Sequence, residues 1–166
     1  MVRTEPAADA VEILRFWFED CRPWQWFRQN SRFDQIIRDR FGNLTVSAQA
    51  GVLTDWERQP GSALALILLL DQFNRHLWRG DPQAFAGDAQ AVVLCRKALQ
   101  QGWIQNEPKR ARRQFWLMPL LHSEEIATVE SAIPLLERWT DPATATIARR
   151  NLKLLIQHGR YPWRDR

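Results

Sequence analysis

The sequence is poor in cysteine and holds no cysteine pattern that points to a metal or a disulfide framework. Its 166 residues include two, Cys21 and Cys95, which lie far apart and outside any Cys-x-x-Cys motif. Zinc sites and disulfide-rich secreted domains use closely spaced cysteines, so neither class is indicated. We expect reduced thiols, a cytoplasmic location, and neither a metal nor a cofactor.

Long apolar runs are missing as well. The longest, residues 63–70, is far short of the roughly 20 residues that a membrane-spanning helix requires. Near the N-terminus, Glu5, Asp9 and Glu12 interrupt the stretch where a signal peptide would be apolar. The sequence therefore predicts a protein that has no membrane partner.

No segment of useful length alternates with period two, and no Pro/Gly/Ser-rich linker divides the chain. Apolar residues instead recur every three or four positions, and nine Trp and eight Phe supply large rings for a core. We predict a single all-α domain over residues 1–166. Its short connections favour antiparallel helical hairpins in a tetratricopeptide-like array or bundle. The hairpin at residues 62–102 has the length of one such repeat, although no second copy of its pattern is found.

Capping residues predict several helix ends. Ser31 is expected to cap a helix that Gly42 ends, and Ser62 to cap a central, largely apolar helix that reaches Gly80. Gly159 is expected to end the last helix of the chain.

A row of polar residues follows the most apolar stretch of the chain. Asp71, Gln72, Arg75 and Arg79 come directly after it at helical spacing. One interpretation is an ordinary ion pair on a solvated face, because residues four apart are neighbours on a helix. The other is a groove in which Asp71 orients Arg75 towards a carboxylate or phosphate, for which the planar guanidinium is well shaped.

The segment "HSEE" is the second polar feature. Ser123 and the acids after it are typical of a helix N-terminus, which leaves His122 unexplained. His122 and Glu125 have a spacing compatible with shared metal ligation, but a carboxylate-bridged metal site would need the Glu-x-x-His motif twice and further Glu residues, which the chain does not supply. His122 beside a carboxylate has the chemistry of a general base, but no Ser or Cys nucleophile with a known signature accompanies it.

Basic charge is concentrated in the second half of the chain. Residues 1–83 hold 10 Lys/Arg and 11 Asp/Glu, whereas residues 84–166 hold 13 and 8. The densest run comprises Lys109, Arg110, Arg112 and Arg113. A surplus this small is equally typical of a soluble arginine-rich protein, so nucleic acid is not favoured as a partner.

Six motifs, taken in order, resemble a known family. They are "ILRFWF", "WFRQNSRFDQIIRDRF", "LALILLLDQF", "RGDPQAFAGDA", "LMPLLHSEE" and "GRYPWR". This series is similar to the bacterial family catalogued as domain of unknown function 924 from about residue 12 to the C-terminus. The resemblance implies a tetratricopeptide-like helical superhelix and no established activity. The family pattern Asp-Gln-Phe-Pro-Arg-Asn is matched here except at Asn74 and His76.

The C-terminal segment carries Arg160 and Arg164, which the family pattern also contains. Pro162 makes this segment too broken for a helix of its own, and Tyr161 and Trp163 give it apolar anchors. We predict that it folds back and brings at least one of the two arginines to Asp71 or Glu124.

These observations favour a helical binding or scaffold module for a small anionic ligand or a peptide. The alternatives are a hydrolase-like enzyme that uses His122 with a nearby carboxylate, and weak nucleic-acid binding through residues 109–113. The candidate ligand-binding residues are Asp71, Gln72, Arg75, Arg79, His122, Ser123, Glu124, Arg160 and Arg164. The sequence does not decide the ligand, the oligomeric state or whether catalysis occurs.

Overall fold

A computed structural model describes residues 8–164, and this part of the chain contains helices and turns but no strand. The all-α prediction is therefore confirmed, whereas the tetratricopeptide-like arrangement stays a prediction. The chain divides into two compact units, Met1–Gly87 and Asp88–Arg166. A single domain over the whole chain likewise stays a prediction.

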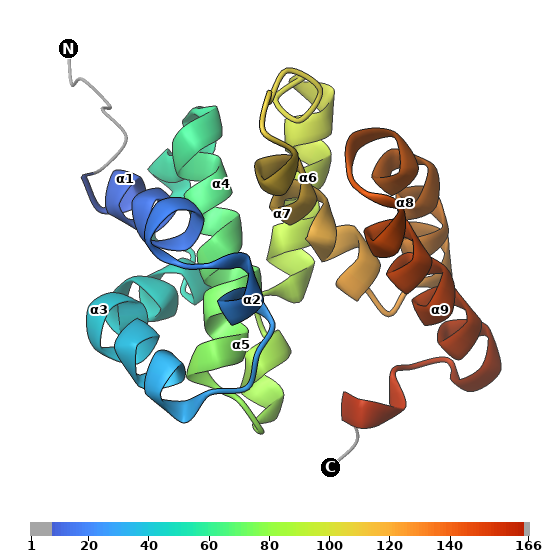
Figure 1. The fold of residues 1–166 in the computed structure, drawn as a ribbon, viewed down its shortest axis with the longest axis horizontal. Helices are drawn as coiled ribbons and strands as arrows, with labels where there is room; N and C mark the ends of the chain where they lie inside the picture. Colours follow the sequence, from blue (N-terminus) through green and yellow to red (C-terminus); the bar gives the residue numbers. More distant parts are fainter. Residues whose placement is uncertain (1–7, 165–166) are drawn as a thin grey trace. The chain divides into compact units, whose positions relative to one another are not determined.

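The first unit is built around aromatic rings. In chain order it contains α1 (Ala8–Arg15), the π-helical turn η1 (Phe16–Asp20), α2 (Pro23–Trp26), α3 (Ser31–Gln49), the 3₁₀ turn η2 (Thr54–Arg58), α4 (Pro60–Leu68), the π-helical turn η3 (Leu69–Phe73), α5 (Asn74–Leu77) and the 3₁₀ turn η4 (Pro82–Phe85). Helix α1 packs beside α4 (Figure 1). Phe16 lies 5.1 Å from Phe41 and 6.1 Å from Phe73 between ring centroids, so η1, α3 and η3 share one core.

The second unit consists of α6 (Asp88–Gln100), α7 (Arg110–His122), α8 (Ile126–Trp139), α9 (Pro142–His158) and the 3₁₀ turn η5 (Pro162–Arg164). Helix α8 packs against both α7 and α9. Gly159 ends α9 with a φ of 74°, as predicted, because this left-handed conformation favours glycine. Among residues 8–164, no helix combines the length and the apolarity needed to cross a bilayer.

Both predicted ends of α3 are wrong. Helix α3 continues through Gly42 to Gln49, and its N-cap is Asn30, whose Oδ1 accepts from the Phe33 amide, rather than Ser31. Burial of residues on both sides of Gly42 holds the helix together, and this outweighs the cost of about 1 kcal/mol for glycine inside a helix.

The central helix also differs from the prediction at its start. It begins at Pro60, and Ser62 lies inside it. The hydroxyl of Ser62 donates to the carbonyl oxygen of Trp56 at 2.7 Å, which ties the helix to the preceding η2 turn.

The central helix does not run evenly to its end, because α4 passes into the π-helical turn η3 before α5 begins. A π-turn holds one extra residue and frequently lies at a functional position. Gly87 packs directly against this turn: a Cβ atom at Gly87 would lie 2.4 Å from the carbonyl oxygen of Leu70. Only glycine fits there without displacing backbone.

Candidate functional site

Asp71 and Gln72 lie on the π-helical turn η3, and Arg75 follows on α5. Nη1 of Arg75 donates to Oδ1 of Asp71 at 2.7 Å and to its carbonyl oxygen at 3.0 Å, while Nε2 of Gln72 donates to Oδ2 at 3.0 Å. The Asp71 side chain is 1% exposed and that of Arg75 is 20% exposed. The predicted orientation of Arg75 by Asp71 is thus confirmed, in a buried network rather than on a solvated face.

Arg79 has a different carboxylate partner. Its Nε and Nη2 donate to the two oxygens of Asp34, on α3, at 2.8 and 3.1 Å. This two-pronged ion pair joins the segment after α5 to α3. Asp34 is therefore a partner that the helical spacing of residues 71–79 did not reveal.

His76 is the buried centre of this second cluster and was not among the predicted site residues. Its Nδ1 lies 2.6 Å from Oδ1 of Asp34, and its Nε2 lies 3.1 Å from the carbonyl oxygen of Trp26. Burial lowers the pKa of His76, although the Asp34 carboxylate acts in the opposite direction. Burial alone would raise the pKa of Asp34, but hydrogen bonds from Arg79 and His76 outweigh it and lower that pKa. The one sequence signal for this cluster is that His76 departs from the family pattern.

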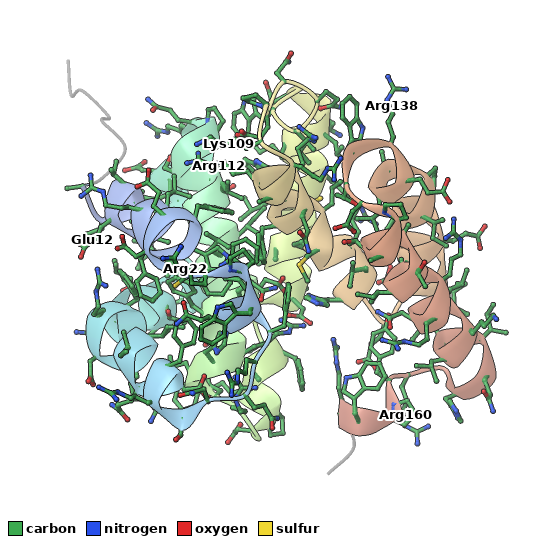
Figure 2. The ribbon with its side chains drawn as sticks, viewed as in Figure 1. Glu12, Arg22, Lys109, Arg112, Arg138 and Arg160 are labelled. Carbon is green, nitrogen blue, oxygen red and sulfur yellow. The ribbon has the colours of Figure 1, made fainter. Side chains whose placement is uncertain are left out.

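In the second unit, Glu124 and Arg164 come together as predicted. Nη1 of Arg164 lies 3.3 Å from Oε1 of Glu124, and Nη2 lies 3.4 Å from Oδ2 of Asp88, with Arg164 12% exposed. The Tyr161 amide donates to Glu124 at 2.8 Å. Arg160 is exposed, and Figure 2 labels it on the segment that follows α9. The prediction that the tail brings an arginine to Glu124 is confirmed for Arg164.

The other residues of "HSEE" have local structural roles. The Ser123 hydroxyl accepts from the Glu125 amide at 3.1 Å, and α8 begins only at Ile126. The carbonyl oxygen of His122 accepts from Arg164 at 2.9 Å. Within residues 8–164, no group of three or more His, Cys, Asp or Glu side chains is placed to hold a metal ion. Ligand contact by His122, Ser123 and Glu124 stays a prediction.

One arginine of the basic run at residues 109–113 is hydrogen-bonded within the fold. Arg113 donates from Nε to the carbonyl oxygen of Trp139 at 2.7 Å and from Nη1 to that of Glu107 at 2.7 Å. Lys109 and Arg110 remain exposed. This geometry removes Arg113 from the charges that could neutralise phosphates.

The structure contains a pocket that the sequence did not indicate. It has a volume of about 330 Å³ and lies between α2, the loop after it and the first turns of α3. Its apolar wall is made by Trp24, Phe33 and Ile36, and its polar wall by Gln25, Arg28, Asn30 and Arg32. A volume of this size is at the lower end of the range for small-molecule sites, roughly 300–1,000 Å³.

The charge of this pocket is of one sign. Both charged lining residues are arginines. Arg28 has its Cζ 5.4 Å from the centroid of the Trp24 ring. Neither Arg28 nor Arg32 has an ion pair or side-chain hydrogen bond with any residue in the range 8–164. The pocket therefore presents two cations and no counter-ion of its own beside an apolar wall.

Comparisons with known proteins give the same picture as the motifs. The family described as bacterial protein of unknown function (DUF924) matches residues 13–166. Among solved structures, the chain is similar to a protein of unknown function, ATU0120, from Agrobacterium tumefaciens. The identity is 31% and the TM-score 0.89, over 96% of this chain and 89% of the other. No curated protein matches the chain.

Proposed function

This chain belongs to the DUF924 family of bacterial proteins of unknown function, and from its own geometry we propose that it is a binding module for a small anionic ligand. The proposed site is the pocket between α2 and α3, with Arg28 and Arg32 as the groups that contact the anion. The observation that carries this proposal is that both arginines line the pocket without an acidic partner among residues 8–164.

Arg32 has a position that its own helix does not favour. It is the second residue of α3, where the helix dipole is positive and a basic side chain is mildly destabilising. Asp34 is the only acid in this first turn, and it is already paired with Arg79 and hydrogen-bonded to His76. Residues that contradict local preference without a compensating contact are expected at functional sites. An anion in the pocket would supply the missing contact.

The pocket is also held in place. Nε1 of Trp26, on α2, donates to the carbonyl oxygen of Trp17 at 2.9 Å. The carbonyl oxygen of Trp26 faces His76, which in turn contacts Asp34 on α3. Helices α2 and α3, which both line the pocket, are therefore held relative to each other by hydrogen bonds through His76, and a preformed site reduces the ordering cost of binding.

Arg75 and the residues around it are the second place where an anion could be recognised. We keep Asp71, Gln72 and Arg75 as a predicted site, supported by the burial of Asp71 and Gln72 on a π-helical turn and by the ion pair of Asp71 with Arg75 on α5. The pocket of Arg28 and Arg32 has the stronger support, because its arginines have no carboxylate partner in the part of the chain that the structure describes.

The test is thermal stability in a panel of small anions. Phosphate, citrate, benzoate and 2-naphthoate are added to the wild type, to a double Arg28→Gln, Arg32→Gln variant, and to Arg58→Gln. Arg58 is the matched control, because it is exposed and paired with Asp55 at 3.2 Å. At least one anion is expected to raise the melting temperature of the wild type and of Arg58→Gln, because a ligand that binds only the folded state stabilises it. Equal stabilisation of the double variant, or no stabilisation of any protein, contradicts the proposal.

A further inference from the structure

Besides the arginines, the pocket is lined by the aromatic and apolar side chains of Trp24, Phe33 and Ile36. Trp24 is 62% exposed and Ile36 is 40% exposed, while Phe33 is 7% exposed. Phe27, at the end of α2, is a further exposed ring at 56%. Large apolar side chains scattered singly on a surface need no explanation, but a cluster beside a pocket marks a binding surface.

The Trp24 ring and the Arg28 guanidinium form a platform. Their separation of 5.4 Å is typical of a cation–π contact, which orients the guanidinium. An aromatic ring that contacts the exposed part of Trp24 would bury apolar area on both partners and hold its own substituent near Arg28. An inorganic anion would contact the arginines but leave the side chains of Trp24 and Ile36 exposed to solvent.

We infer that the ligand of this pocket is a flat aromatic ring that carries a carboxylate or phosphate group. The ring lies against Trp24 and Ile36, and the anionic group contacts Arg28 and Arg32. This inference rests on the proposed function, because it names the class of the anion that the pocket takes. The volume of about 330 Å³ suits one small molecule of this kind.

The inference is tested with matched probes on the full chain. The probes are 2-naphthoate and 2-naphthyl phosphate, which combine ring and charge, 2-naphthamide, which lacks the charge, and acetate and inorganic phosphate, which lack the ring. Binding is followed by NMR on the indole N–H of Trp24, assigned with Trp24→Phe. At ordinary ligand efficiency a ring system of this size reaches a dissociation constant of about 1 mM or tighter.

We expect at least one ring-bearing anion to shift the Trp24 signal in a saturable way. It should bind about tenfold more tightly than 2-naphthamide, as the loss of one charged hydrogen bond would cause, and about tenfold more tightly than acetate or inorganic phosphate, which lack the ring. The comparison of the two ring-bearing anions shows whether the carboxylate or the phosphate is preferred. If acetate or inorganic phosphate binds as tightly as the ring-bearing anions, the inference fails and the proposed function stands. If 2-naphthamide binds as tightly as 2-naphthoate, the anion-binding function fails as well. If no probe binds, both are wrong.

Discussion

Nδ1 of His76 lies 2.6 Å from Oδ1 of Asp34, and this contact joins α5 to α3 in the interior of the first unit. Arg79 contacts the same carboxylate, so one acid serves two basic side chains. Nε2 of the same imidazole faces the carbonyl oxygen of Trp26, at the end of α2. The cluster thus links three helices, two of which line the pocket.

The first prediction concerns the pH dependence of stability. Burial lowers the pKa of folded His76 below 6.5, so as the pH falls the unfolded state takes up this proton first. The free energy of unfolding should therefore fall as the pH falls from 6.5 towards the folded pKa. The pKa of Asp34 is also lowered, which gives a second loss of stability below pH 3.8. Chemical denaturation across this range measures both losses.

Two variants separate the contribution of His76 from the rest. His76→Asn should abolish the loss of stability that begins at pH 6.5. Replacement of the exposed His158 by Asn should leave that loss in place. Stability of the wild type that rises as the pH falls below 6.5 would show that the attraction of Asp34 outweighs burial, and would contradict this prediction.

The second prediction concerns the contact between Gly87 and the π-helical turn. Gly87→Ala places a Cβ atom 2.4 Å from the Leu70 carbonyl oxygen and should cost roughly 1–3 kcal/mol or more. Gly61→Ala is the control, because its added Cβ atom would lie no closer than 3.9 Å to the Leu14 side chain and alanine is favoured in a helix by up to about 1 kcal/mol. Urea denaturation of both variants measures the difference. Equal stability of the two would show that η3 can move away from Gly87 freely.

The third prediction concerns the buried pair of Asp71 and Arg75. Arg75→Ala leaves a carboxylate that is 1% exposed without its cation and should cost about 3–5 kcal/mol. Adding Asp71→Asn should recover part of this loss, so the two changes are not additive. The exposed pair of Asp55 and Arg58 is the control, with an expected coupling of about 0–1 kcal/mol. A coupling energy as small as this for Asp71 and Arg75 would contradict the prediction and show that their ion pair contributes little to stability.

The fourth prediction concerns the two arginines of the C-terminal segment. Arg164 is 12% exposed and lies between Asp88 and Glu124, so Arg164→Ala should lower the free energy of unfolding by about 3 kcal/mol. Arg160 is exposed, and its replacement by Ala should cost under about 1 kcal/mol. Thermal denaturation of both variants provides the comparison. The reverse order would mean that Arg160 rather than Arg164 anchors the segment.

The helical class and the Asp71–Arg75 pair could be predicted from the sequence because both depend on the spacing of residues along a helix. It missed the continuation of α3 through Gly42, because burial of the neighbouring residues overrides the preference of one glycine. It also missed the π-helical turn, since one extra residue hardly disturbs an apolar run. His76 and the pocket depend on residues that only the fold brings together, such as Asp34 and Trp26.

Asn74 and His76, the two departures from the family pattern on the central helix, both have buried hydrogen-bond partners. Asn74 is fully buried and its Nδ2 donates to the carbonyl oxygens of Gln83 and Ala84 at 2.9 and 3.1 Å. His76 is also buried and bonded. Both residues that depart from the pattern thus serve packed hydrogen-bond networks of this chain. A sequence shows such a substitution but does not show its distant partners.

The stability of α3 provides an independent check on Arg32. Because Arg32 lies in the first turn of α3 and pairs with no acid among the described residues, Arg32→Glu should stabilise the fold by about 0.3–1 kcal/mol while it abolishes anion binding. Chemical denaturation measures the stability. A clear loss of stability would show that Arg32 is kept for the fold and not for a ligand.

The most direct test of the anion-binding site is a reversal of its charge. In a double Arg28→Glu, Arg32→Glu variant, circular dichroism is expected to stay unchanged, because neither arginine has an ion pair to lose within residues 8–164. Dissociation constants are then measured for 2-naphthoate and for the cation 2-naphthylmethylammonium, with Arg58→Glu as the control. We predict that the wild type and the control prefer 2-naphthoate and that the double variant prefers the cation. The same preference in all three proteins would contradict the account.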